Sequence, residues 1–175
     1  DVTALYQICK AAKESFFLAY LHAAIKAVNQ TEAFRYRIVE NQVYLYHTSH
    51  VTATIARDHG PFAFSFIEFT PDFEAFKKAA TAEIQRVKSA QGLDLSVVRD
   101  NIVHFSTLPW FTFKSLSHAR DLDTQDCSPK ITFGKTYSAH KRLLMPVSIH
   151  VHHGFVYGED VADFISNFQK LLDPK

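Results

Sequence analysis

The chain has 175 residues, 47% of them hydrophobic and 16 of them phenylalanine, which predicts one packed domain over residues 1–175 and excludes a disordered chain. Nineteen basic residues balance 18 acidic ones without a basic block, and no apolar run is long enough for a membrane helix, so neither nucleic acid nor a membrane is expected as partner. The only cysteines, Cys9 and Cys127, form no disulfide framework, which favours a reducing, cytoplasmic location. The sequence begins at Asp1 without a methionine, and we expect that an N-terminal segment is missing.

The N-terminal half changes from a helical to an extended pattern. Thr3 and Ser15 are candidate N-caps of two helices, and the second helix is apolar on nearly all sides, which predicts that it is buried. The period then becomes two, with apolar residues alternating with Arg35 and Arg37 before a turn at Glu40–Asn41, which predicts a hairpin. The expected elements are helices over 1–13 and 15–29, strands over 34–38, 43–47, 51–56 and 62–70, and a helix over 71–90.

The C-terminal half has longer strands and one more helix. A polar loop is expected over 91–100 and an irregular segment over 115–128, with strands over 102–106, 131–138 and 142–151 and a helix over 159–172. Helices packed on a mixed sheet place the fold in the α+β class, as a two-layer α/β sandwich. The side chains of the last helix expected to face inward are Val161, Phe164, Ile165, Phe168, Leu171 and Leu172.

Two adjacent histidines, His152 and His153, close the last apolar strand ahead of a glycine-containing turn. By alternation His153 shares the apolar face, so its imidazole is expected in a dry place where it stays neutral and accepts a proton, as a general base for an alcohol must. One alternative is a purely structural histidine. Another is a metal site that uses the His150–His153 cluster with ligands drawn from His104, Glu159 or Asp160, although no fixed spacing supports it.

Four ordered motifs then carry a resemblance. Residues 34–38 read F-R-x-R, 106–110 read Ser-x-x-Pro-Trp, 129–135 read Pro-x-x-Thr-x-Gly-Lys, and 145–153 form an apolar strand that ends in His-His. In these motifs the chain resembles the chloramphenicol acetyltransferase family from its start to Leu172.

The resemblance implies transfer of an acetyl group from acetyl-CoA to a hydroxyl of chloramphenicol or a similar small molecule, without a metal. His153 would take the proton of the acceptor hydroxyl, and Ser106 would stabilise the tetrahedral oxyanion. Trp110, Thr132 and Lys135 would lie on the acetyl-CoA side. A homotrimer with active sites between subunits is also implied. Without the resemblance, Trp110 would read as core packing and Lys135 as an ordinary surface lysine.

The pattern breaks at Tyr157, where the family has an aspartate that pairs with an upstream arginine and shapes the histidine turn. Glu159 or Asp160 could substitute for that carboxylate. In addition, His118 stands where the family commonly has an apolar residue. We therefore expect weak or altered transfer. The alternatives are a catalytically impaired homologue that only binds small molecules or CoA, and an enzyme similar to the dihydrolipoamide acyltransferases.

Overall fold

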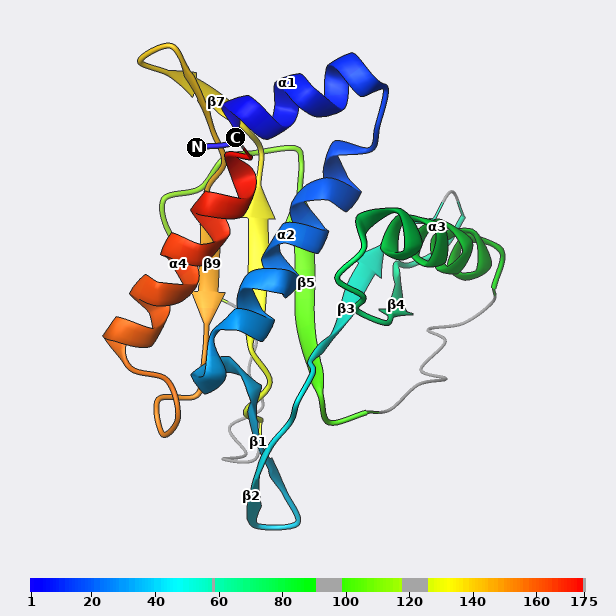
Figure 1. Cartoon of the computed structure of the whole chain (residues 1–175). Coiled ribbons are helices and arrows are strands. Elements are labelled where there is room, and N and C mark those ends of the chain that lie inside the picture. Colours follow the sequence, from blue (N-terminus) through cyan, green and yellow to red (C-terminus); the bar gives the residue numbers. More distant parts are fainter. Residues whose placement is uncertain (58, 91–98, 118–125, 175) are drawn as a thin grey trace.

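A mixed five-stranded sheet with helices on one face forms the frame of the molecule (Figure 1). The computed structural model describes residues 1–57, 59–90, 99–117 and 126–174. The helices are α1 (Thr3–Ala12), α2 (Phe16–Gln30), the short 3₁₀ helix η1 (Glu32–Arg35), α3 (Phe73–Ser89) and α4 (Gly158–Leu172). The strands are β1 (Tyr36–Val39), β2 (Gln42–Leu45), β3 (His50–Ile55), β4 (Ala63–Ile67), β5 (Ile102–Leu108), β6 (Lys130–Gly134), β7 (Tyr137–Ala139), β8 (Arg142–Leu144) and β9 (Val147–His150).

The strand order of the main sheet is β4-β3-β5-β6-β9. The three central strands run parallel, and the two outer strands are antiparallel to their neighbours. Two small hairpins, β1–β2 and β7–β8, extend the molecule at opposite ends (Figure 1). This arrangement confirms the predicted α+β class and its two layers.

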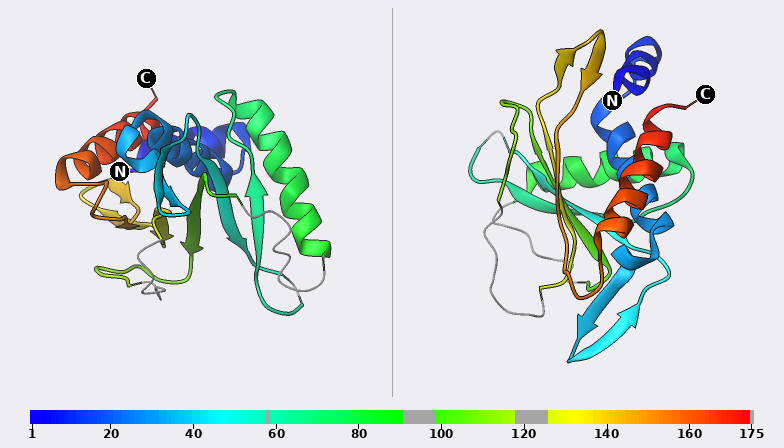
Figure 2. Two further views of the ribbon diagram at one scale, coloured as in Figure 1. Left: turned by 90° about the horizontal axis from the view of Figure 1, so that it is seen from below. Right: turned by 90° about the vertical axis from the view of Figure 1, so that its left-hand side faces the viewer.

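The two faces of the sheet differ in chemistry. The helices gather on one side, where apolar residues of β3, β4, β5 and β6 are buried, and the opposite side carries no helix within the described residues (Figure 2). On that opposite side, strand alternation and register place hydroxyl, imidazole and ammonium groups. These residues are Thr52, Thr54, His104, Ser106, Lys130, Thr132, Ser148 and His150. None of the helices in the described ranges is long and apolar enough to cross a membrane.

The predicted N-caps have different outcomes. Ser15 does cap α2, because its hydroxyl accepts a hydrogen bond from Leu18 N at 3.3 Å. The prediction for Thr3 was wrong, since Thr3 is already the first helical residue. The Asp1 carboxylate accepts from Thr3 N at 3.0 Å instead, and the Thr3 hydroxyl accepts from Leu143 N at 2.8 Å, which ties α1 to β8.

The long C-terminal hairpin is interrupted, in contrast to the two continuous strands expected over 131–138 and 142–151. Phe133 pairs with Val147 and Tyr137 with Leu144, so three residues on one side face two on the other. Pro146 lies in this gap and has no N–H to donate to the ladder. A local bulge therefore divides the hairpin into the β6–β9 and β7–β8 pairs.

Two predictions of burial were wrong. Ile165 on α4 is 51% exposed rather than facing inward. Arg37, expected on the polar side of its strand, is only 1% exposed. Its guanidinium donates to four backbone carbonyls at 2.7–2.9 Å, among them those of Asp100 and Ile102. Burial lowers the pKa of Arg37 to about 10, so the side chain stays charged at neutral pH and fastens the β1–β2 hairpin to the start of β5.

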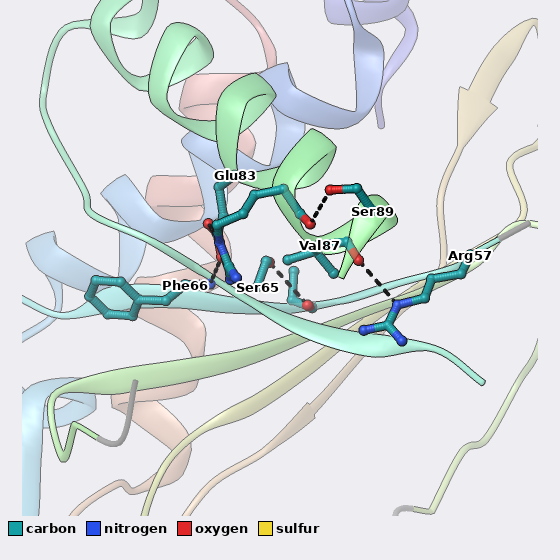
Figure 3. Close-up of polar contacts among 8 residues, drawn as sticks. Arg57, Ser65, Phe66, Glu83, Val87 and Ser89 are labelled. Carbon is teal, nitrogen blue, oxygen red and sulfur yellow. Dashed lines mark hydrogen bonds and ion pairs between the residues drawn. The ribbon is translucent and has the colours of Figure 1, made fainter. Parts of the chain in front are cut away.

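Helix α3 is attached to the edge of the sheet by polar contacts (Figure 3). Its Glu83 carboxylate accepts from Phe66 N at 2.9 Å, and its Val87 carbonyl accepts from Arg57 Nε at 3.1 Å. The predicted loop over 91–100, which follows this helix, falls mostly outside the described residues.

Candidate active site

The turn between β9 and α4 carries the histidine pair. The ladder between β6 and β9 ends at Lys130 and His150, and the chain then turns, with the N–H groups of Phe155 and Val156 both donating to the His152 carbonyl at 3.0 and 3.1 Å. Alternation therefore stops before it reaches His153, whose side chain is exposed in the single chain. The expectation that His153 continues the dry, apolar face of the strand was wrong for this reason.

A backbone carbonyl orients the His153 ring. Nδ1 of His153 lies 3.3 Å from the Val156 oxygen. A carbonyl can only accept a hydrogen bond, so this contact requires the proton on Nδ1, and in the neutral ring the lone pair is then on Nε2. In the neutral ring, Nε2 is therefore the nitrogen that can accept a proton.

The first turn of α4 places an acidic side chain beside the backbone of Tyr157. Tyr157 N donates to the Asp160 carboxylate at 2.8 Å, so Asp160, one of the two acids considered from the sequence, closes the helix start. The Tyr157 ring packs edge-on against His153, with ring centroids 5.6 Å apart and planes at 66°. At position 157 the chain therefore has an aromatic ring that contacts the imidazole of His153.

Ser106 belongs to a row of hydroxyl groups across the polar face of the sheet. It pairs in register with Thr132 on β6, which in turn pairs with Ser148 on β9. From β3, the Thr54 hydroxyl donates to Ser106 Oγ at 3.4 Å. Since Ser106 accepts this hydrogen bond, its own hydroxyl proton remains available for another acceptor.

Within one chain the histidine and the serine are separated. Ser106 and Ser148 are two strand spacings apart, about 10 Å, and His153 follows Ser148 by five residues along an initially extended chain. The sequence predicted both groups, but the fold of a single chain does not bring them together.

Of the three residues assigned to the acetyl-CoA side, Thr132 lies in the middle of β6, Lys135 directly follows β6, and Trp110 follows β5. Thr132 is 1% exposed, whereas Trp110 is 69% exposed, which excludes the alternative that Trp110 is core packing. Lys135 is exposed, and its N–H donates to the Phe111 carbonyl at 3.0 Å, so the segment that follows β5 is fixed beside it.

Gly134 permits this close approach. A Cβ atom built on Gly134 would lie 2.7 Å from Pro146 and 2.8 Å from Phe113. The glycine of the Gly-Lys motif therefore has a packing role in addition to its place in the motif.

One residue considered from the sequence is not described by the structure, and one residue of the site was not predicted. His118 falls outside the described residues. No group of three or more His, Cys, Asp or Glu side chains suited to a metal ion occurs in the described parts of the chain. Sequence reasoning missed Thr54, and its place on an alternating strand was the only available signal.

Known proteins resemble the chain in sequence and in fold. Chloramphenicol acetyltransferase 3 of Escherichia coli is 27% identical over 177 residues, which cover 100% of this chain and 83% of that protein. A solved chloramphenicol acetyltransferase structure has a TM-score of 0.88 at 26% identity, covering 97% of this chain and 83% of that chain. The dihydrolipoamide acetyltransferase of Azotobacter vinelandii has a TM-score of 0.76 at 14% identity, covering 99% of this chain and 78% of that one. That likeness shows the fold alone and does not favour the lipoamide alternative.

The family model described as chloramphenicol acetyltransferase matches residues 1–169. This match extends through all four motifs, the histidine turn and most of α4. The chain therefore belongs to the chloramphenicol acetyltransferase family, whose members are acyltransferases.

Proposed function

We propose that the protein transfers the acetyl group of acetyl-CoA to a hydroxyl of chloramphenicol or a closely similar small molecule. Membership of the family supports the reaction class and acetyl-CoA as co-substrate. The observation that carries the proposal is the His153 ring, whose Nδ1 contact with the Val156 carbonyl leaves Nε2 as the accepting nitrogen. A neutral imidazole with a defined tautomer is the group needed to deprotonate an alcohol near neutral pH.

The reaction follows from these two side chains. Nε2 of His153 takes the proton of the acceptor hydroxyl as the oxygen attacks the thioester carbonyl carbon. The carbonyl oxygen becomes an oxyanion, to which Ser106 Oγ donates a hydrogen bond. The intermediate then collapses with cleavage of the carbon–sulfur bond, and the departing thiolate takes the proton back from His153. The products are the acetyl ester and free CoA, and no covalent enzyme intermediate forms.

The sites lie between subunits of a homotrimer in this proposal. The separation of His153 and Ser106 in one chain supports it, because a general base and an oxyanion donor must each be within about 3 Å of the same reacting centre. A neighbouring subunit supplies the second group, and a closed ring of three identical interfaces repeats the site three times.

Acetyl-CoA is bound from the end of β6 at which Trp110 and Lys135 are exposed. An exposed indole offers a stacking surface, and an ammonium group suits a phosphate. Thr132 lies beside Ser106 and faces the intermediate. We place the reaction in the reducing cytoplasm, in keeping with two buried free thiols at Cys9 and Cys127.

The test is acetyl-CoA-dependent release of thiol in the presence of chloramphenicol, with wild type, His153→Ala and, as a matched control, His47→Ala. His47 is an exposed histidine outside the site. We expect wild type and His47→Ala to be active and His153→Ala to lose 10²–10⁴-fold in rate with an unchanged circular dichroism spectrum. If His153→Ala keeps more than about a tenth of the rate, His153 is not the base.

A further inference from the structure

Two aromatic rings of the turn that carries His153 contact the histidine pair, Tyr157 against His153 and Phe155 against His152. The Tyr157 and His153 rings meet edge to face, with centroids 5.6 Å apart. On the other side Phe155 lies 5.1 Å from His152 and is stacked 5.7 Å from Tyr36 of β1. The two histidine rings are therefore each in contact with an aromatic neighbour from the same turn.

The contact between the Tyr157 side chain and His153 is separate from the hydrogen bond that caps α4. The backbone N–H of Tyr157 makes the capping hydrogen bond to Asp160, so the cap does not depend on the phenol. The side chain is 55% exposed, and it therefore adds little to the core. Its contact with the imidazole is the feature that distinguishes this position.

The hydrogen bond to Val156 alone holds the imidazole loosely. At 3.3 Å it is longer than the usual 2.7–3.2 Å for N–H···O bonds, and it restrains only the Nδ1 edge of a ring that turns about its bond to Cβ. A second contact from an aromatic edge restricts that rotation, and edge-to-face ring pairs are a favoured geometry.

We propose that Tyr157 is a positioning residue for the general base: its ring, rather than a carboxylate, fixes the plane of the His153 ring and so keeps Nδ1 on the Val156 carbonyl. This inference rests on the proposed function. It predicts that the ring matters and that the phenol hydroxyl does not. It also predicts that an aspartate at position 157 is no improvement, because Asp160 already caps the helix.

The test compares Tyr157→Phe, Tyr157→Leu and Tyr157→Asp, with Tyr44→Leu on β2 as a control for loss of an exposed aromatic. We expect Tyr157→Phe and Tyr44→Leu to stay within about twofold of wild type, and the other two to lose about two- to tenfold in kcat with the KM for acetyl-CoA unchanged. A Tyr157→Leu variant as fast as wild type, or a Tyr157→Asp variant that is faster, would overturn the proposal.

A second readout does not require turnover. Nitrogen-15 NMR of the His153 imidazole reports which ring nitrogen carries the proton. We expect the Nδ1–H form in wild type and Tyr157→Phe, and a mixture of tautomers in Tyr157→Leu. An unchanged tautomer in Tyr157→Leu contradicts the positioning role. An inactive wild type with the expected NMR pattern contradicts the proposed reaction instead, so the two failures are distinguishable.

Discussion

Co-expression of two inactive variants tests whether the active site is shared between subunits. In a single chain Ser106 lies about 10 Å from Ser148 across the sheet, and His153 is five residues farther along. His153→Ala and Ser106→Ala chains are each expected to lose at least about a hundredfold in rate. If each site takes its histidine from one subunit and its serine from the next, a mixed trimer contains some sites in which both groups are intact.

The recovered activity can be calculated from random assembly. With equal amounts of the two variants, half of the positions that supply the histidine and half of those that supply the serine are intact, so about a quarter of the sites are complete. Thiol release by the co-expressed mixture, purified without selection for either tag, is therefore expected at about 25% of the wild-type rate. The control co-expresses two differently tagged His153→Ala chains, which stay inactive.

Recovery near zero refutes the shared site, provided that purification through both tags shows that mixed oligomers form. A site assembled within one chain contains either the mutated histidine or the mutated serine in every copy, so mixing restores nothing.

Three further predictions concern groups around the site and the core. Thr54→Val removes the hydrogen bond that Ser106 accepts, so kcat should fall about two- to tenfold, whereas Thr52→Val on the same face should leave it unchanged. Arg37→Met removes the donor of four backbone carbonyls and should lower the free energy of unfolding in urea by about 3 kcal/mol or more, against less than about 0.5 kcal/mol for the exposed Arg142→Met. Burial lowers the pKa of His22 below its usual 6.5, so the unfolded chain binds a proton that the folded chain resists, and stability falls as the pH drops below about 6.5. The pKa of His50 is also lowered, so His22 is not the only group that contributes. His22→Gln should therefore weaken, not abolish, the loss of stability measured between pH 7 and pH 5. An unchanged dependence of the free energy of unfolding on pH would contradict the assignment to His22.

Much of the fold was predictable because its signals are local. The Ser15 cap, the Glu40–Asn41 turn and the apolar stripes of the helices depend on neighbours within a few residues. Ser106 and His153 were also singled out from short sequence motifs, Ser106 through the family resemblance, and their roles remain predictions.

The wrong predictions for His153 and Arg37 have a non-local cause. The exposure of His153 depends on where β6 begins, at Lys130, since alternation has meaning only while a partner strand lies alongside. The burial of Arg37 depends on carbonyl acceptors more than 60 residues away. The link between Thr54 and Ser106 requires the parallel pairing of β3 with β5, which no periodicity reveals.

The exchange at position 157 shows why a lost motif residue is weak evidence for a lost activity. In the family resemblance, one aspartate both shapes the turn and supports the histidine. Here Asp160 accepts the hydrogen bond at the start of the helix, and the Tyr157 ring contacts the imidazole. The hydrogen bond that sets the tautomer comes from the Val156 carbonyl and involves neither side chain. The chemistry requires only the Nδ1–H tautomer and a fixed plane of the His153 ring. Residues of the turn can supply both although Tyr157 replaces the aspartate. The activity of Tyr157→Asp measures how completely they do so.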